Sequence, residues 1–136
     1  MPKTPDPLLQ AIVPVRVRYQ ECDPMNVAHH SAYPVWLEIA RTELLRQQGQ
    51  TYRDLEAAGE FLVVARLSVC YRRPARYDDL LDVRVELRPT AGVKLEHVYE
   101  IVRGGELLAT AKTTLACVDA EGALRPVPQR LLNPGP

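Results

Sequence analysis

The residue types with the most chemical potential gather in one short stretch, residues 20–30 (QECDPMNVAHH). The stretch has no hydrophobic period, which indicates a loop, and Asp23 stands in it seven residues before His30. A helix with Pro34 in its first turn is expected directly afterwards. The start of a helix presents unpaired N–H groups and partial positive charge, which could hold a carbonyl and the oxyanion formed when it is attacked. A nearby carboxylate could attack that carbonyl or deprotonate water, so this loop could supply a hydrolytic site.

Each of these residues also has a purely structural interpretation. Asp-Pro commonly starts a turn, so Asp23 could simply shape the loop. His29 and His30 are adjacent and point in different directions, as histidines that pack loops or cap helices do. Together with Asp23 they match no common zinc spacing, so we expect no metal. His97 alternates with its neighbours in an expected strand, and we interpret it as half-buried structure.

Two elements would hold this loop in place. Residues 13–19 alternate apolar and polar side chains, which predicts a strand with one buried face, and Pro14 favours its start or a sheet edge. Residues 32–48 carry apolar side chains almost all round a helix, with Ser31 able to cap its start and Gly49 suited to its end. We therefore expect a long helix that other elements largely enclose.

The rest of the chain predicts a short helix and four strands. Thr51 to Asp54 resembles a capping box and opens a helix that ends before Gly59. Strands are expected over residues 61–71, 81–88, 93–102 and 106–118, with turns at Ala91-Gly92 and Gly104-Gly105. Residues 1–11 and 129–136 are expected to be irregular. The prediction is a single α+β domain of residues 1–136, in which an antiparallel sheet of about five strands wraps one long central helix.

Composition limits the class of protein. The 136 residues are 46% hydrophobic and 25% charged, which is typical of a folded domain that buries a core without disulfides or metal. A formal net charge of zero argues against nucleic-acid binding, and no segment approaches the length of a bilayer. Three scattered cysteines, with no CxxC pair and no signal-peptide pattern, predict a cytoplasmic protein with reduced thiols.

Three runs of the chain resemble the 4-hydroxybenzoyl-CoA thioesterase family. They are residues 17–45, which contain the loop and the helix start, and residues 69–80 and 106–111 in the later strands. The similarity extends over roughly residues 13–128. It implies the hotdog fold, in agreement with the order of elements, and hydrolysis of an acyl-CoA thioester to a free acid and CoA.

The resemblance also implies roles for individual residues. Asp23 falls on the family's catalytic aspartate, as nucleophile or general base, and the backbone N–H of His30 falls on the amide that polarises the thioester carbonyl. The residues expected to bind substrate are Asn26, Val27, His29, Tyr33 and Lys94. Asn26 stands where the family usually has Gly, but Asn tolerates left-handed backbone angles. Lys94 is a candidate for the CoA phosphates, with a solvated strand position as its alternative.

The resemblance further implies a homodimer or homotetramer with active sites between subunits. Acyl-CoA would be the substrate, and neither metal nor redox cofactor would be needed, because CoA is part of the substrate. The acyl group and the choice between CoA and an acyl carrier protein stay open. Two other functions are also open: an enoyl-CoA hydratase or dehydratase, in which His29 or His30 would act with the acid, and a non-catalytic acyl-CoA-binding protein.

Overall fold

Five long strands form one antiparallel sheet within residues 6–90 and 92–132, which this computed structural model describes. They are β1 (Leu9–Arg16), β2 (Phe61–Tyr71), β3 (Leu80–Arg88), β4 (Lys94–Arg103) and β5 (Glu106–Val118). The order across the sheet is β1–β3–β4–β5–β2, and a short sixth strand, β6 (Leu124–Arg125), pairs with β5. The helices are α1 (Ala32–Gln47), α2 (Tyr52–Ala57) and two short 3-10 helices, Tyr19–Glu21 and Gln129–Leu131.

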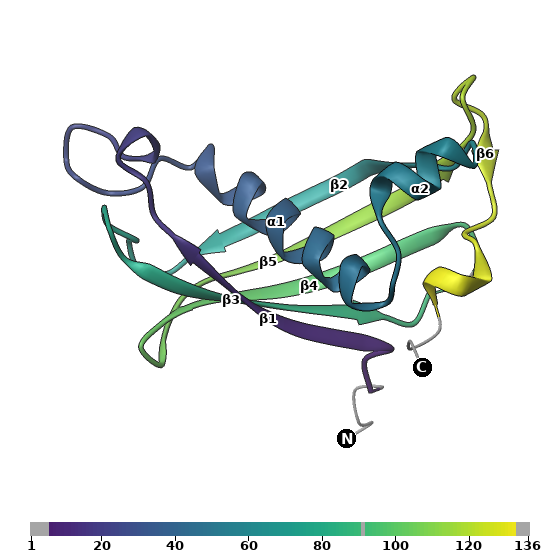
Figure 1. Cartoon of the computed structure of the whole chain (residues 1–136). Coiled ribbons are helices and arrows are strands. Elements are labelled where there is room, and N and C mark those ends of the chain that lie inside the picture. Colours follow the sequence, from purple (N-terminus) through teal and green to yellow (C-terminus); the bar gives the residue numbers. More distant parts are fainter. Residues whose placement is uncertain (1–5, 91, 133–136) are drawn as a thin grey trace.

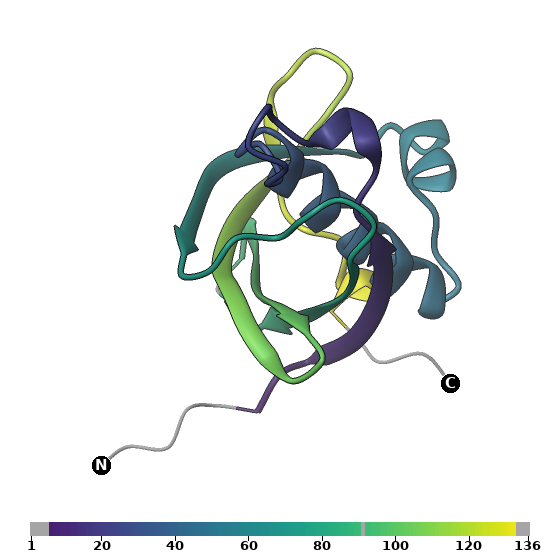
Figure 2. The same cartoon turned by 90° about the vertical axis from the view of Figure 1, so that its left-hand side faces the viewer.

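The long helix α1 crosses one face of the sheet and packs on β1 and β3 (Figure 1). Viewed end-on, the sheet curls around this helix (Figure 2). The alternation along β3 explains this packing, because its inward residues, from Leu81 to Leu87, are at most 3% exposed. The arrangement confirms the predicted α+β fold of one long helix wrapped by an antiparallel sheet. No helix in the described part of the chain combines the length and hydropathy needed to cross a membrane.

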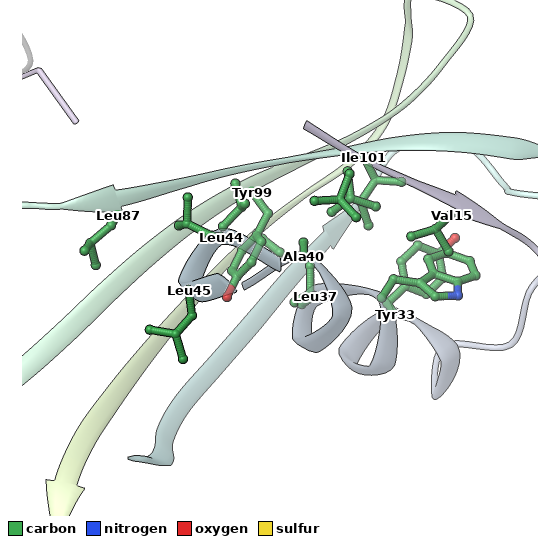
Figure 3. Packing of buried hydrophobic residues seen from close by; sticks show 14 of the residues in the cluster. Val15, Tyr33, Leu37, Ala40, Leu44, Leu45, Leu87, Tyr99 and Ile101 are labelled. Carbon is green, nitrogen blue, oxygen red and sulfur yellow. The ribbon is translucent and has the colours of Figure 1, made fainter. Parts of the chain in front are cut away.

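The core lies between α1 and the curled sheet. Trp36, Leu37 and Ala40 are fully buried, and Figure 3 shows Tyr33 beside Val15 near one end of the helix. Removing each large apolar side chain from water contributes about 1.5–3 kcal/mol, so this face of α1 anchors the fold. Part of the helix that was expected to be largely enclosed stays open in the single protomer. Val35 and Ile39 of α1 remain 44% and 39% exposed, respectively.

The N-terminal part differs from the prediction because strand pairing sets its ends. β1 begins at Leu9, opposite Leu87 of β3, so residues 9–11 are not irregular. It ends at Arg16, and Tyr19 lies in a 3-10 helix with its side chain 81% exposed, not on the buried face of a strand. Pro14 does lie on an edge strand, as expected of a residue that cannot donate to a sheet.

The predictions for turns and the C-terminus are partly confirmed. Gly104 and Gly105 form the β4–β5 turn, with φ angles of 53° and 85° that favour glycine at both positions. Ala91, in the other predicted turn, lies outside the described residues. The tail is not irregular throughout: Gln129–Leu131 form a 3-10 helix because Leu131 is buried against the core. Residues 133–136 lie outside the described range.

His97 on β4 is more deeply buried than the sequence indicates. Its side chain is 6% exposed, and its Nδ1 has no hydrogen-bond partner in the described structure. Burial, and then the positive charge of Arg41, lower the pKa of His97 to about 3. An unfolded histidine has a pKa near 6.5. Below that pH the unfolded chain therefore binds a proton at His97, whereas the folded chain stays unprotonated there until the pH is much lower.

Acid should therefore destabilise the protein through His97. At pH 5 the unfolded chain gains about 2 kcal/mol from this proton relative to neutral pH. We expect the unfolding free energy of the wild type to fall by about that much more than that of His97→Gln between pH 7.5 and pH 5. Urea denaturation of both proteins at the two pH values measures the difference. Equal losses in the two proteins would show that His97 protonates as readily in the fold as outside it.

Candidate active site

A buried carboxylate holds the loop between β1 and α1 against the core. Glu21 is 7% exposed; its side chain accepts hydrogen bonds from the backbone N–H of Arg18 (2.8 Å) and the indole N–H of Trp36 (3.0 Å). Its backbone carbonyl accepts the N–H of His29 at 2.7 Å. Because Trp36 is fully buried, Glu21 couples both ends of the loop to α1. The sequence did not single out Glu21, since a loop without period gives no signal for a buried acid.

The two carboxylate oxygens of Asp23 have different surroundings. Oδ1 accepts the backbone N–H groups of Met25 (2.9 Å) and Val27 (3.4 Å), which folds the loop into a tight turn. The N–H of Asp23 also donates to the carbonyl of Val27 at 2.9 Å. Oδ2 accepts no hydrogen bond from any residue that the structure describes. The turn-shaping interpretation of Asp23 is thus correct for one oxygen, while the other stays available for chemistry.

Asn26 occupies the turn in the left-handed region, with a φ of 63°. Its N–H donates to the carbonyl of Asp23 at 2.9 Å, so the left-handed angle is part of what closes the turn. Asn reaches this region at a lower energetic cost than most other residues with a side chain. The structure therefore shows how the chain keeps the turn without Gly at this position.

The start of α1 is capped by an unexpected side chain. Ser31 stands at the N-cap position, but it has helical angles and its side chain makes no capping bond. Its hydroxyl instead lies 2.8 Å from Nδ1 of His29, which also accepts the backbone N–H of Ser31 at 3.2 Å. The ring of His30 packs against that of His29, with centroids 4.0 Å apart. The backbone N–H of His30 donates to no acceptor within the described ranges, so it is free to bind a ligand.

A hollow of about 330 Å³ opens beside this helix start. It is lined by Ala28, His30, Tyr33, Tyr71, Arg72, Arg73 and Pro74. Tyr33 is buried and meets Tyr71 edge-to-face, with ring centroids 4.8 Å apart. Burial raises the pKa of Tyr33, whose hydroxyl is hydrogen-bonded to the backbone of Ala75, so the ring stays neutral. The hollow thus has an aromatic wall, and two arginines lie at its rim.

The β2–β3 connection that forms this rim is fastened to the Asp23 loop. The N–H of Ala28 donates to the carbonyl of Ala75 at 2.8 Å, and the two segments lie at the same end of the molecule (Figure 1). Asp79 braces the connection through Arg103, at 2.7 Å. Partial burial opposes ionisation of Asp79, but hydrogen bonds from the backbone of Arg76 and from Arg103 outweigh it and lower the pKa of the carboxyl.

The structure brings together most of the residues expected at the site. His30 and Tyr33 line the hollow, and Asp23, Asn26, Val27 and His29 lie on the adjoining loop. Lys94 is not brought there in this protomer. Lys94 on β4 lies opposite Ala116 on β5, and Ala116 lies opposite Val63 on β2. Lys94 is therefore level with Val63, which is eight residues, or about 27 Å, along β2 from Tyr71.

Sequence reasoning missed Tyr71, Arg72 and Arg73, although they fall inside one of the runs that carry the family resemblance. The only available signal was that polar residues follow directly after a predicted strand. Among the described residues, no three His, Cys, Asp or Glu side chains gather where they could hold a metal ion.

A larger hollow, of about 750 Å³, lies over β1, β3 and β4. Its charged side chains pair with one another, as Arg84 does with Glu100 at 3.6 Å and Arg88 with Glu86 at 2.7 Å. It lies on strands away from the Asp23 loop and from any helix start. We therefore assign the chemistry to the smaller hollow beside α1.

Known proteins have the same fold and related sequences. Residues 17–134 match the model of the thioesterase-like superfamily, so the chain belongs to this family, whose class is that of thioester hydrolases. It is 32% identical to the putative acyl-CoA thioesterase YneP of Bacillus subtilis over 121 residues, which cover 88% of this chain and 87% of the relative. It is 36% identical to the acyl-CoA thioester hydrolase YbgC of Escherichia coli, covering 78% of this chain and 80% of that protein.

The crystal structure of a hypothetical protein, TT1821 from Thermus thermophilus, superposes with a TM-score of 0.84 at 34% identity. The match covers 91% of this chain and 93% of that one. These neighbours confirm the hotdog fold.

The conformation of Asn26 gives a direct test of the turn. We expect Asn26→Gly to keep both stability and activity, because Gly adopts a φ of 63° without strain. Asn26→Val should lose about 1–2 kcal/mol of unfolding free energy, or open the turn and lose activity, because a β-branched residue is strained there. Thermal unfolding and a hydrolysis assay of both variants measure this. Equal behaviour of Gly and Val would show that the left-handed turn is not needed.

Proposed function

We propose that the protein hydrolyses acyl-CoA thioesters, releasing a free acid and CoA. The observation that carries this proposal is that a free backbone N–H, on His30, and a free carboxylate oxygen, on Asp23, lie on one fixed loop beside a hollow. The N–H would donate to the thioester carbonyl, and the positive end of α1 would stabilise the oxyanion as it forms. The thiolate of CoA then leaves, and the acyl group ends as the free acid.

The second oxygen of Asp23 would act in one of two ways. It could attack the carbonyl, giving an anhydride that water then hydrolyses, or it could take a proton from the attacking water. Both routes need one oxygen free while the other fixes the side chain, and the hydrogen bonds from Met25 and Val27 to Oδ1 supply that restraint. Neither route needs a metal or a redox cofactor, and we propose that none is used.

Replacing Asp23 by Asn tests this assignment cleanly. The amide oxygen of Asn can still accept the turn hydrogen bonds, so the loop keeps its shape while the charge is lost. We expect thiol release from a panel of short, long and aromatic acyl-CoA esters, 4-hydroxybenzoyl-CoA among them. Asp23→Asn should reduce kcat by about 10²–10⁴-fold.

Asp119 offers a matched control, because its Oδ1 also accepts two loop N–H groups, from Glu121 and Ala123, both at 2.9 Å. Asp119→Asn should leave turnover unchanged. Near-full activity of a folded Asp23→Asn would remove Asp23 from the mechanism. Consumption of crotonyl-CoA without thiol release would instead favour a hydratase, and tight binding of esters without turnover would favour a binding protein.

We also propose that two copies pair through β2. This eleven-residue strand ends the sheet, so its outer N–H and C=O groups have no strand partner in the described protomer. Three apolar side chains on this strand are 42–49% exposed: Val63, Val64 and Leu67. On α1, Val35 and Ile39 are exposed to a similar degree. A two-fold axis normal to the sheet would run the two β2 strands antiparallel and keep both helices on one face. With that axis near Arg66, the hollow at Tyr71 lies between the subunits.

A charge at the middle of β2 should break this pairing. We expect the wild type to have at least twice the 15.3 kDa chain mass, and Leu67→Lys to be a monomer with little activity. Light scattering after size exclusion, with a thiol-release assay on each peak, measures both properties. Ile12→Lys is the control, because Ile12 is 61% exposed on the opposite edge strand, β1. An active Leu67→Lys monomer would contradict the shared site.

A further inference from the structure

A second hollow, of about 360 Å³, lies between α1, α2 and β2 and has no part in the chemistry described so far. Arg41 and Tyr52 lie on its polar side, and Leu62 and Val64 of β2 form an apolar wall. Glu38 and Glu56 also line it. The hollow therefore combines an apolar wall with one arginine and two glutamates.

The cation, Arg41, is unusual because it is buried with no carboxylate at hydrogen-bonding distance among the described residues. Its side chain is 8% exposed, and its guanidinium is hydrogen-bonded to the hydroxyls of Tyr52 and Tyr99, which are neutral. Its Nε has no hydrogen-bond partner in the described structure. The carboxylate of Glu38 lies 3.8 Å from Nη2, beyond hydrogen-bonding distance, on a side chain that is 69% exposed.

Such a cation is costly to bury until an anion pairs with it. The edge of a guanidinium formed by Nε and one Nη atom matches the two oxygens of a carboxylate. In Arg41 this edge is open to a ligand at Nε, which has no partner in the described structure, and the carboxylate nearest to Nη2 is the loosely placed Glu38. The chemistry of the position therefore fits a carboxylate of a ligand, which would replace Glu38 as the partner of Nη2.

The position of this hollow follows from the direction of α1, which runs opposite to β2. Tyr33 at the start of the helix contacts Tyr71 at the end of β2, whereas Arg41 farther along lies by Leu62 and Val64. A two-fold axis at the middle of β2 brings Tyr71 of one protomer to the Leu62 end of β2 in its partner. The hollow beside His30 thus meets the partner's second hollow across the interface.

We infer that the two hollows form one acyl-binding channel, and that the partner subunit's Arg41 binds a carboxylate at the far end of the acyl group. This inference rests on the proposed thioester hydrolysis and on the proposed β2 pairing. The substrate class is an ω-carboxyacyl-CoA, the CoA monothioester of a dicarboxylic acid. Its methylene groups would contact Leu62 and Val64, and its thioester would reach the N–H of His30.

Pairs of CoA esters matched in length test the substrate class. Straight-chain acyl and ω-carboxyacyl esters of four to eight carbons are compared by kcat/KM, after subtraction of spontaneous hydrolysis. We expect the wild type to prefer the carboxyl-ended ester at least tenfold at one or more lengths, and Arg41→Met to lose that preference. Arg46→Met, a control on the same helix whose arginine pairs with the exposed Glu43, should keep it. A wild type that prefers the plain ester at every length would overturn the proposal.

Because Arg41 is buried, a second variant and a second measurement guard against misfolding. Tyr52→Phe keeps the ring but removes a hydroxyl that holds the guanidinium, and it should lower the preference several-fold. Calorimetry with non-hydrolysable thioether analogues measures binding without turnover. Preference for the carboxyl-ended analogue without hydrolysis of any ester would contradict the proposed function alone. Hydrolysis without any such preference would contradict the channel alone.

Mixed dimers test whether Arg41 acts across the interface. In a dimer of Asp23→Asn with Arg41→Met, one site combines an intact Asp23 with the partner subunit's intact Arg41. We expect mixing of the two inactive or unselective variants to restore selective hydrolysis of the carboxyl-ended ester. If Arg41 served the site of its own chain, no site in the mixed dimer would be complete, and selectivity would not return.

Discussion

The site depends on one buried carboxylate, that of Glu21. A carboxylate removed from water needs several good donors, and here the indole of Trp36 and the backbone of Arg18 provide them. Since Trp36 is packed on all sides by the core, its indole cannot shift without disturbing the sheet. The loop is therefore held rigidly, because Glu21 ties it to the packed core. The N–H of His30 and the second oxygen of Asp23 are thus held in place by the anchored loop and its turn, so in the proposed reaction the substrate would not have to order them.

The elements that the sequence predicted correctly are those whose ends are set by residues close by in the sequence. β2 and β5 fall at the predicted residues, and the alternation of β3 and the glycine turn before β5 are reproduced. The errors lie where contacts with residues distant in the sequence set the ends of an element. Leu9 is in a strand because Leu87 lies opposite, and Leu131 is ordered because the core has room for it. Neither partner can be identified from a window of a few residues.

The same distinction holds for the site. Asp23 and His30 belong to one loop, so their spacing alone suggested chemistry. Tyr71 and its neighbours come from the end of a strand about forty residues later, and only the antiparallel course of α1 and β2 brings them beside the loop. Lys94 lies at the opposite end of the sheet from Tyr71 in the same protomer, so within one chain it does not join the hollow, and its expected contact with the CoA phosphates stays a prediction.

Pro14 lies on an open edge of the sheet, where it bears on how a further strand could be added. A sheet with two open edges could add copies at both sides and extend into a fibre. β1, the edge opposite β2, carries a proline as the sixth of its eight residues, and proline has no N–H to offer a further strand. β2 is therefore the edge better suited to accept a copy, and if two copies pair through it about a two-fold axis as proposed, that edge is fully occupied in the dimer. With β2 paired in this way, the missing N–H of Pro14 would disfavour the addition of further copies at β1 and would favour a closed assembly over a fibre.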